Sequence, residues 1–261
     1  FRISLFGGSS DIESMYKYLG GLCVGMAINR YSYILIKDLP PFFDYKIKLS
    51  YSQLENVQYI DQIGHQSVRE TLNHFAKNHN LDPTLEIHHL SDLPAKMGIG
   101  SSSSFLVALI KGLSEYCHQD YNKHELAVLA NYIERHVLAE SGGVQDPIWA
   151  SYGGLGKIIL RIGEDTLHNF SFQPIKVTDS DDIDYLVQSM VLFYLGTTRR
   201  AADISKTYTL KDNIHQELVQ IATEGARAIK NLDIPTIGKL LHENWQRKKS
   251  CCGKKFRKQS W

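Results

Sequence analysis

The residues best suited to chemistry lie in a short segment rich in glycine and serine. Gly98-Ile99-Gly100 precedes four consecutive serines, and residues 105–116 follow with the composition of a helix. The glycines allow a tight turn and the close approach of a ligand. Serines in the first turn of a helix accompany free N–H groups that favour phosphate, and a serine hydroxyl can ligate Mg²⁺. The segment indicates either a phosphate site or a plain glycine turn with a serine cap.

Three acidic residues form a second group of candidates. Glu134 and Glu140 are six positions apart, which would place them on different faces of a helix. A carboxylate at Glu134 is a suitable oxygen ligand for Mg²⁺. Asp146 lies between glycines and Pro147, where it could accept a proton from a substrate hydroxyl. Taken singly, each of these residues is more often a solvated charge or a turn aspartate than a catalytic group.

Other catalytic motifs are excluded by inspection. Each Gly-Lys pair lacks a following serine or threonine, so there is no P-loop, and the Gly98 turn lacks the third glycine of a dinucleotide fingerprint. The serines are not flanked as a nucleophile elbow requires. The 11 histidines show no metal-ligand spacing.

The composition is that of a globular protein. The chain has 261 residues, 43% apolar and 22% charged, which is enough for one large domain or two small ones. The longest strictly apolar run, residues 105–110, is far below the ~20 residues of a membrane span. The four cysteines show no CxxC spacing, so we expect a reduced, cytoplasmic protein without a membrane helix.

Charge is distributed unevenly along the chain. Residues 1–246 carry 22 basic and 28 acidic residues, whereas residues 247–261 carry seven basic residues and no acidic one. A mildly acidic body does not indicate a nucleic-acid-binding protein. The basic end has one interleaved aromatic residue before its last position, Phe256, and a nucleic-acid patch there is the less favoured interpretation.

The order of expected elements favours an α+β fold, because strands and helices are mixed irregularly. We expect a hairpin at Asn29-Arg30, a loop at residues 145–147, an acidic turn at residues 179–184 and a domain boundary near Pro174. Strands are expected at residues 2–6, 22–28, 31–36, 45–50, 84–89, 158–162, 168–172 and 187–195. Helices are expected at residues 12–19, 64–78, 105–116, 123–139, 199–207, 214–231 and 236–246.

Three of these segments together resemble a known family. Residues 1–11 (FRISLFGGSSD), residues 98–104 (GIGSSSS) and residues 133–146 (IERHVLAESGGVQD) occur in the order expected of the GHMP kinases. The chain is most similar to the D-glycero-D-manno-heptose 7-phosphate kinase branch, through residues 7–11, 145–154, 192–200 and 243–248. The resemblance covers residues 1–249.

The resemblance implies a fold of two domains. Residues 1–174 would form an ATP-binding domain similar to ribosomal protein S5 domain 2, and residues 175–261 a ferredoxin-like domain. The family's third motif, a glycine-rich loop near the C-terminus, is absent, and residues 250–261 resemble nothing in the family. We therefore expect a C-terminal domain left incomplete by truncation or a frameshift. The start at Phe1, inside an expected strand, indicates a missing N-terminus.

The resemblance also assigns roles to residues. Asp146 would act as the base or orient the attacking hydroxyl. Glu134 and Ser102 would hold Mg²⁺, with Ser101 as the fallback for Ser102. The ATP phosphates would be bound by Lys96, Gly98, Ile99, Gly100, Ser101, Ser102, Ser103 and Ser104. The substrate would be bound by Arg2 and Asp11, which lie in the family's first motif, where the aspartate binds sugar hydroxyls. Arg199 and Lys248 are weaker candidates for the phosphate of the substrate.

The activity implied is that of an ATP-dependent, Mg²⁺-dependent sugar kinase. Its acceptor would be a hydroxyl of a heptose 7-phosphate or related sugar, most naturally the anomeric one. The alternatives are a fucose- or galactose-type kinase and a non-catalytic relative that binds sugar and nucleotide. Retention of Glu134 and Asp146 favours the kinase, whereas the missing third motif favours the non-catalytic relative. No nucleic-acid or membrane partner is expected, and a homodimer is left open.

Overall fold

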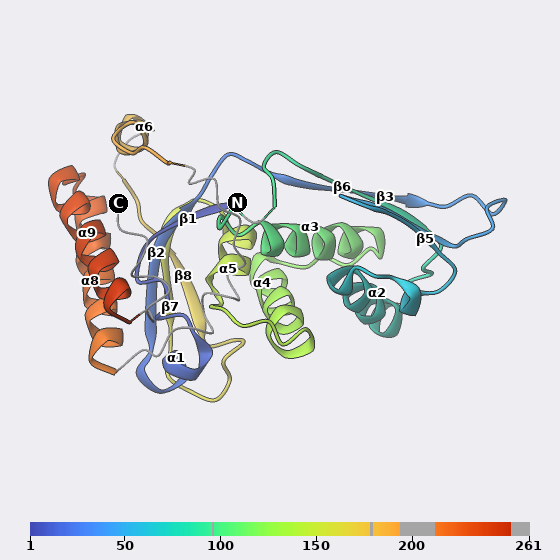
Figure 1. The fold of residues 1–261 in the computed structure, drawn as a ribbon, viewed down its shortest axis with the longest axis horizontal. Helices are drawn as coiled ribbons and strands as arrows, with labels where there is room; N and C mark the ends of the chain where they lie inside the picture. The colour runs from blue at the N-terminus through green and yellow to red at the C-terminus, as the bar shows by residue number, and fades with distance from the viewer. Residues whose placement is uncertain (96, 178–179, 194–211, 252–261) are drawn as a thin grey trace.

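The computed structural model describes residues 1–95, 97–177, 180–193 and 212–251. Within these ranges the strands form two four-stranded sheets, ordered β1-β2-β7-β8 and β3-β6-β4-β5 (Figure 1). Helices α8 and α9 lie on one side of the first sheet, while α3, α4 and α5 lie between the two sheets. The expected α+β class is confirmed.

The first sheet carries the beginning of the chain. It contains β1 (Arg2–Phe6), β2 (Gly21–Ala27), β7 (Leu155–Leu160) and β8 (Phe170–Pro174), and each neighbouring pair is antiparallel. Burial alternates along β7, as expected for a strand with its two faces in different environments. One face packs on α8 (Asp212–Lys230) and α9 (Ile234–Cys251), and α5 (Gln145–Tyr152) contacts β1 and β2 from the interior.

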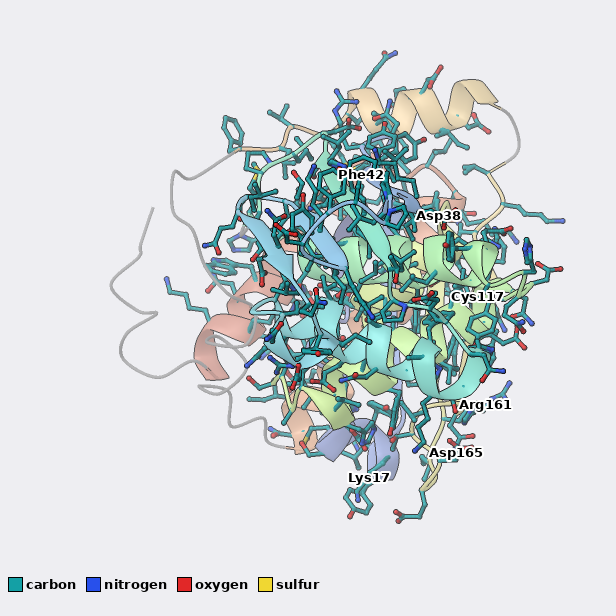
Figure 2. The ribbon with its side chains drawn as sticks, turned by 90° about the vertical axis from the view of Figure 1, so that its right-hand side faces the viewer. Lys17, Asp38, Phe42, Cys117, Arg161 and Asp165 are labelled. Atoms are coloured by element: carbon teal, nitrogen blue, oxygen red, sulfur yellow. The ribbon has the colours of Figure 1, made fainter. Side chains whose placement is uncertain are left out.

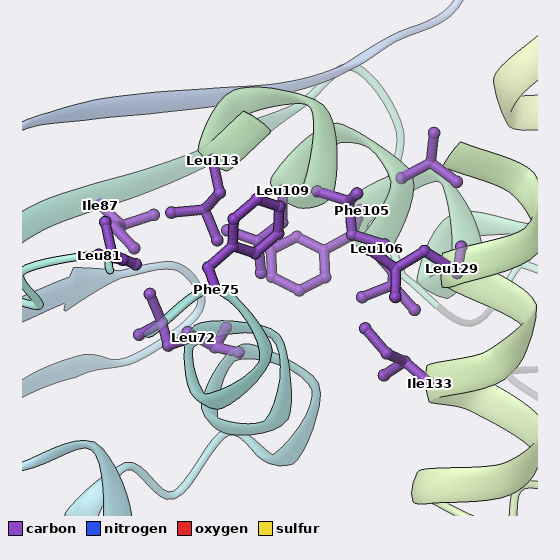
Figure 3. Close-up of a cluster of buried hydrophobic side chains, with 14 of the residues drawn as sticks. Leu72, Phe75, Leu81, Ile87, Phe105, Leu106, Leu109, Leu113, Leu129 and Ile133 are labelled. Carbon is purple, nitrogen blue, oxygen red and sulfur yellow. The ribbon is translucent and has the colours of Figure 1, made fainter. Parts of the chain in front are cut away.

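The second sheet is covered on one side by two helices. It contains β3 (Ser32–Asp38), β6 (Leu85–Ser91), β4 (Ile47–Ser50) and β5 (Leu54–Val57), and β4 and β6 are parallel. Helices α2 (Gln66–His79) and α3 (Ser101–Tyr116) pack beneath it, as Figure 1 shows. The apolar side chains meet between these layers, with Phe75 of α2 facing Leu109 and Phe105 of α3 (Figure 3).

Helix α3 forms the centre of this core because its sequence is apolar on most sides. Leu109, Ile110 and Leu113 have no exposed surface, and Leu106 is 1% exposed. Truncating such a side chain to alanine typically costs about 2–5 kcal/mol. This packing fixes the helix along its length, so that its first turn is held rigidly at the glycine loop.

The remaining elements lie in the connections along the chain. Helix α4 (Lys123–Tyr132) begins at a capping box between Asn122 and Glu125, and it continues into a π-helical turn, η2 (Ile133–Val137). Helix α1 (Glu13–Leu19) is tied to the β7–β8 connection, where Tyr16 donates to the Thr166 carbonyl at 2.9 Å. Figure 2 shows Lys17 and Asp165 at this same end of the molecule. A 3₁₀ turn, η1 (Ile60–Gln62), precedes α2, and α6 (Ser180–Gln188) follows β8.

Several sequence expectations were wrong. Asn29-Arg30 is no hairpin, because β2 and β3 belong to different sheets. Residues 145–147 begin α5 rather than forming a loop. The expected acidic turn at residues 179–184 is largely helix α6, and residues 189–193 of the strand expected at 187–195 form no strand. The expected helix at 199–207 lies outside the described residues.

In the part of the chain described after Pro174, the elements are helices α6, α8 and α9. The ferredoxin-like arrangement and the division into domains at residue 174 stay predictions. None of the described helices is both long enough and apolar enough to cross a membrane.

Candidate active site

The glycine-rich segment forms the entry to helix α3. Gly98 and Gly100 have φ angles of 76° and 75°, in the left-handed region that glycine adopts at little cost. Gly100 is the N-cap of α3, and its carbonyl accepts the amide of Ser104 at 2.9 Å. A glycine cap offers no side-chain acceptor to the first-turn N–H groups, which therefore remain suited to an external anion.

The four serines of this segment differ in their surroundings. Ser102 is exposed, whereas Ser103 and Ser104 are only 4% and 7% exposed. Ser103 Oγ donates to Glu134 Oε1 at 2.6 Å. The serine that contacts Glu134 in this structure is therefore Ser103. The sequence analysis had placed Ser103 only among the residues expected to bind the ATP phosphates.

Glu134 is a buried carboxylate on the π-helical turn. It is 2% exposed, and its second oxygen accepts from Arg135 Nη2 at 2.9 Å. Burial raises the pKa of Glu134 to about 7, although the neighbouring Arg135 and the Ser103 hydroxyl lower it in part. Burial therefore outweighs the effects of Arg135 and Ser103 on this carboxyl group. π-Helical turns are frequent at functional sites.

Asp146 lies in the first turn of α5 and faces Arg2. Arg2 Nε donates to Asp146 Oδ1 at 2.7 Å, and Nη2 donates to Oδ2 at 2.9 Å. The third guanidinium nitrogen, Nη1, donates to the Gly98 carbonyl at 2.9 Å, and the Arg2 amide donates to Ile99 O at 3.1 Å. One arginine at the start of β1 therefore joins Asp146 to the glycine loop. The sequence had placed Arg2 only among substrate-binding residues.

Asp11 fixes the loop after β1 to the start of α5. It is 1% exposed, and its carboxylate accepts from the Ser9 amide at 2.9 Å and from the Gln145 amide and Nε2 at 3.3 and 3.1 Å. The carboxylate is therefore satisfied by donors of the protein itself. In this structure it positions Gln145, the neighbour of Asp146, and its contact with a sugar stays a prediction.

A small cavity of about 210 Å³ lies beside this loop, lined by Ile12, Glu13, Ser14, Arg135, Glu140, Ser141 and Gly142. Its lining includes two carboxylates and one guanidinium. Arg135 Nη1 donates to the Glu140 carbonyl at 2.8 Å, and Nη2 of the same guanidinium donates to Glu134 Oε2 at 2.9 Å, so this arginine joins the cavity wall to Glu134.

The other residues assigned from the sequence are distributed as follows. Lys248 on α9 reaches Gly8, in the loop after β1. Lys96 and Arg199 lie outside the described residues.

Among the residues described, no group of three or more His, Cys, Asp or Glu side chains could hold a metal ion. A cation here would instead combine one carboxylate with hydroxyl, phosphate and water oxygens, a set that suits Mg²⁺.

The buried Glu134, the glycine-capped start of α3 and the Arg2–Asp146 pair are the candidate site residues that the described structure places on this α+β fold. Residues 66–154 match the GHMP kinases N terminal domain. The chain thus has the GHMP kinase fold, and the resemblance read from the sequence is confirmed.

The relatives agree with this assignment. The chain is 27% identical to the D-glycero-alpha-D-manno-heptose 7-phosphate kinase of Campylobacter jejuni, over 95% of this chain and 75% of that protein. It superposes with a TM-score of 0.79 on a D-glycero-D-manno-heptose 1-phosphate kinase from Bacteroides thetaiotaomicron, at 25% identity, covering 95% of this chain and 77% of the other. A bifunctional fucokinase/GDP-fucose pyrophosphorylase of Arabidopsis thaliana is 25% identical to this chain. The matched region covers 62% of this chain and 16% of that protein.

Proposed function

We propose that this protein is a sugar kinase that transfers the γ-phosphate of ATP to a hydroxyl of a heptose phosphate. The observation that carries the proposal is the convergence of Arg2, Asp146 and the glycine loop at one point. Gly100 lies against this pair, since a Cβ built on it would be 3.3 Å from Arg2 Cγ and 3.5 Å from Asp146 Oδ2. The carboxylate is therefore adjacent to the helix terminus at which phosphate would bind.

The donor phosphates would be held by the first turn of α3 and by the loop from Gly98. The N–H groups at the helix start and the positive end of its dipole favour the negative charge of a triphosphate. The core packing of α3 fixes these donors before the nucleotide arrives, which avoids reorganisation during the reaction. Lys96, beside this loop in the sequence, is a further proposed phosphate ligand.

The residues present fit a magnesium ion. Glu134 offers a buried carboxylate with a raised pKa, and the exposed Ser102 hydroxyl is the proposed second protein ligand. Ser103 would orient Glu134 through its 2.6 Å hydrogen bond. When bound, Mg²⁺ neutralises charge on the transferring phosphoryl group.

Asp146 is proposed to orient the attacking hydroxyl of the acceptor. Two of its lone pairs are directed at Arg2, so the acceptor hydroxyl would donate to a remaining lone pair of the same carboxylate. The proton released on attack would pass to this carboxylate or to the phosphate oxygens. Arg2 would keep the carboxylate in place and contribute positive charge where negative charge develops.

The proposed acceptor class comes from the relatives. Both heptose kinases carry a heptose phosphate in their names, and the position of the phosphate differs between them. Two proteins with fucokinase in their names match a smaller share of this chain, 62% and 64%, so fucose is the second acceptor to test. A cytoplasmic location and a homodimer stay predictions.

The decisive experiment is a phosphate-transfer screen with ATP and Mg²⁺, read by ³¹P NMR. The acceptors are D-glycero-D-manno-heptose 7-phosphate, the unphosphorylated heptose, fucose and galactose. We expect transfer to the heptose 7-phosphate, with a new anomeric phosphate signal. Binding of ATP and sugar without transfer to any acceptor would instead identify a non-catalytic relative.

A further inference from the structure

One serine in the loop that follows β1 has a backbone conformation that serine rarely adopts. The φ angle of Ser9 is 83°, in the left-handed region, where a Cβ atom comes too close to a backbone carbonyl oxygen. The same loop has glycine at another left-handed position, Gly7, with a φ angle of 74°. Serine at position 9 therefore strains the backbone in a way that glycine would not.

Helix termination does not account for this conformation. Among the residues that the structure describes, the other non-glycine residues with a positive φ lie one or two positions beyond the last residue of a helix. Their φ angles are 50° to 54°, and they are Asn80 after α2, His118 after α3, Ala139 after η2 and Leu232 after α8. A single left-handed residue is a common way for a helix to end. Ser9 instead lies between a strand, β1, and the start of α1.

The strained backbone is held in place by the candidate active site. The Ser9 amide donates to Asp11 Oδ1 at 2.9 Å, while Asp11 Oδ2 accepts from the amide and Nε2 of Gln145 at 3.3 and 3.1 Å. One carboxylate thus fixes Ser9 relative to α5, on which Asp146 follows Gln145. Strained residues persist where the surrounding contacts over-determine them, and they are concentrated at functional sites.

The two serines of this loop differ in what their hydroxyl groups contact. Ser10 has no exposed surface, and its Oγ donates to the Leu22 carbonyl at 3.1 Å. Ser9 is half-buried, and its accessible hydroxyl has no hydrogen-bond partner in the part of the chain that the structure describes. The Ser9 side chain therefore adds strain without a hydrogen bond to the protein that would offset it, which points to a contact outside the chain.

The chemistry of the loop indicates which group suits Ser9. A serine hydroxyl is uncharged and can both donate and accept a hydrogen bond, and the hydroxyl groups of a sugar have the same two capacities. The Asp11 carboxylate, which the Ser9 amide contacts at 2.9 Å, is unsuited to a nearby phosphate, since two anions repel each other. A sugar hydroxyl is therefore the better partner.

We propose that the Ser9 hydroxyl forms a hydrogen bond with a hydroxyl group of the acceptor sugar and so helps to determine which acceptors are used. This inference rests on the proposed kinase function and adds to it a specificity-determining residue. The strain at Ser9 accompanies this contact, so stability and acceptor use should change in opposite directions when position 9 becomes glycine.

The test compares Ser9→Ala, which removes the hydroxyl and keeps the strained Cβ, with Ser9→Gly, which removes both. We expect kcat/KM for D-glycero-D-manno-heptose 7-phosphate to fall about 3- to 10-fold in both variants, the effect of one neutral hydrogen bond. The same heptose without its phosphate should lose the same factor, and KM for ATP should not change. The melting temperature should rise by about 2–4 °C for Ser9→Gly and stay at the parent value for Ser9→Ala.

A matched control relieves backbone strain away from the site. His118 is exposed, has a φ angle of 54° and lies at the end of α3 opposite the glycine loop. His118→Gly should raise the melting temperature by a similar amount and leave the kinetics of both sugars and of ATP at the parent values. The control separates a general gain in stability from the loss of the Ser9 hydroxyl.

Each alternative gives a different pattern. Parent-like kcat/KM in Ser9→Ala would overturn the inference, and a loss in Ser9→Gly alone would assign the effect to the flexibility of the loop. A loss confined to the phosphorylated sugar would assign the hydroxyl to a phosphate, and a raised KM for ATP would assign it to the nucleotide. All four results overturn the inference while the kinase function stands.

The proposed function can also fail by itself. If the parent protein transfers phosphate to no acceptor, calorimetric binding of D-glycero-D-manno-heptose 7-phosphate to the parent protein and to Ser9→Ala decides the inference. Weaker binding by Ser9→Ala supports the contact with the sugar, and equal binding overturns it.

Discussion

The Arg2 guanidinium and the Asp146 carboxylate form a bidentate pair across 144 positions of sequence, with N–O distances of 2.7 and 2.9 Å. Their side chains are 13% and 17% exposed, so the pair is shielded from solvent without being fully buried. A planar fork facing a planar carboxylate fixes orientation as well as distance. The pair therefore joins β1, α5 and the glycine loop into one rigid unit at the proposed point of phosphoryl transfer.

Replacing Asp146 with Asn should lower kcat about 10²- to 10⁴-fold, because the amide cannot accept a proton and loses the charge that orients the hydroxyl. ATP affinity should stay nearly intact, since the carboxylate does not contact the α3 N–H groups. Steady-state kinetics and ATP calorimetry measure the two effects. Unchanged turnover in folded protein would remove Asp146 from the catalytic role.

The glycine loop offers a matched pair of substitutions. Gly98→Ala and Gly100→Ala both force a side chain into the left-handed region, which costs about 1 kcal/mol each. A Cβ at Gly98 meets no atom within 4 Å, whereas one at Gly100 presses on Arg2 at 3.3 Å. We expect similar melting temperatures for the two variants and a lower kcat for Gly100→Ala alone. The larger Gly100→Val should abolish ATP binding.

Equal activity of the two alanine variants would show that the Arg2–Asp146 geometry does not depend on Gly100. ATP bound by folded Gly100→Val as tightly as by the parent protein would contradict the phosphate-loop assignment itself. A melting curve for each variant separates both results from a loss of folded protein.

The two central serines should behave differently. Ser102→Ala removes a proposed Mg²⁺ ligand and should weaken Mg²⁺-dependent ATP binding without shifting its pH profile. Ser103→Ala removes the hydrogen bond to Glu134, so the pKa of that carboxyl should rise and the pH profile of Mg²⁺ binding should move to higher pH. Calorimetry of ATP and Mg²⁺ between pH 6 and pH 9 measures both effects. If the pH profile of Mg²⁺ binding shifted for Ser102→Ala and not for Ser103→Ala, Ser102 would be the serine that lowers the pKa of Glu134, and both proposed roles would be wrong.

The sequence predicted the elements whose signals are local. The helix behind the serines and the strand before Gly7 follow from periodicity and turn residues. The roles that the family motifs give to Asp146 and Glu134 stay predictions. The hairpin expected at Asn29-Arg30 was wrong because two apolar strands joined by a short polar segment have the same sequence pattern whether they pair with each other or enter two different sheets. Tertiary packing alone decides between these arrangements.

The missed parts of the site depend on contacts distant in sequence. The pairing of Arg2 with Asp146 spans 144 residues, and the meeting of Ser103 with Glu134 spans 31. Residues 145–147 were expected to form a loop because Gly142, Gly143 and Pro147 suggest one. Proline is nevertheless tolerated in the first turn of a helix, where the backbone N–H groups have no intrahelical partner, and Pro147 is the third residue of α5.

The last prediction concerns the pH dependence of stability that Glu134 produces. Its pKa in the fold is about 7, against an ordinary value of 4.5, and burial is the main cause. The native state therefore holds a proton between pH 4.5 and pH 7 that the unfolded chain releases, so stability is lost as the pH rises through this range.

In the metal-free protein, the Glu134→Gln variant removes this titration. The free energy of unfolding of the parent protein, relative to the variant, should fall by about 2–3 kcal/mol between pH 4.5 and pH 8. Urea unfolding in the presence of EDTA measures the difference, and only the pH dependence is diagnostic, since the variant also changes the contact with Arg135. Adding Mg²⁺ should stabilise the parent protein more at pH 8 than at pH 5.5, because the ion binds the deprotonated carboxylate, and should stabilise the variant little. If the free energies of unfolding of the parent protein and of the variant in EDTA changed with pH in parallel, the pKa of Glu134 would not be raised in the folded protein, and this prediction would be wrong.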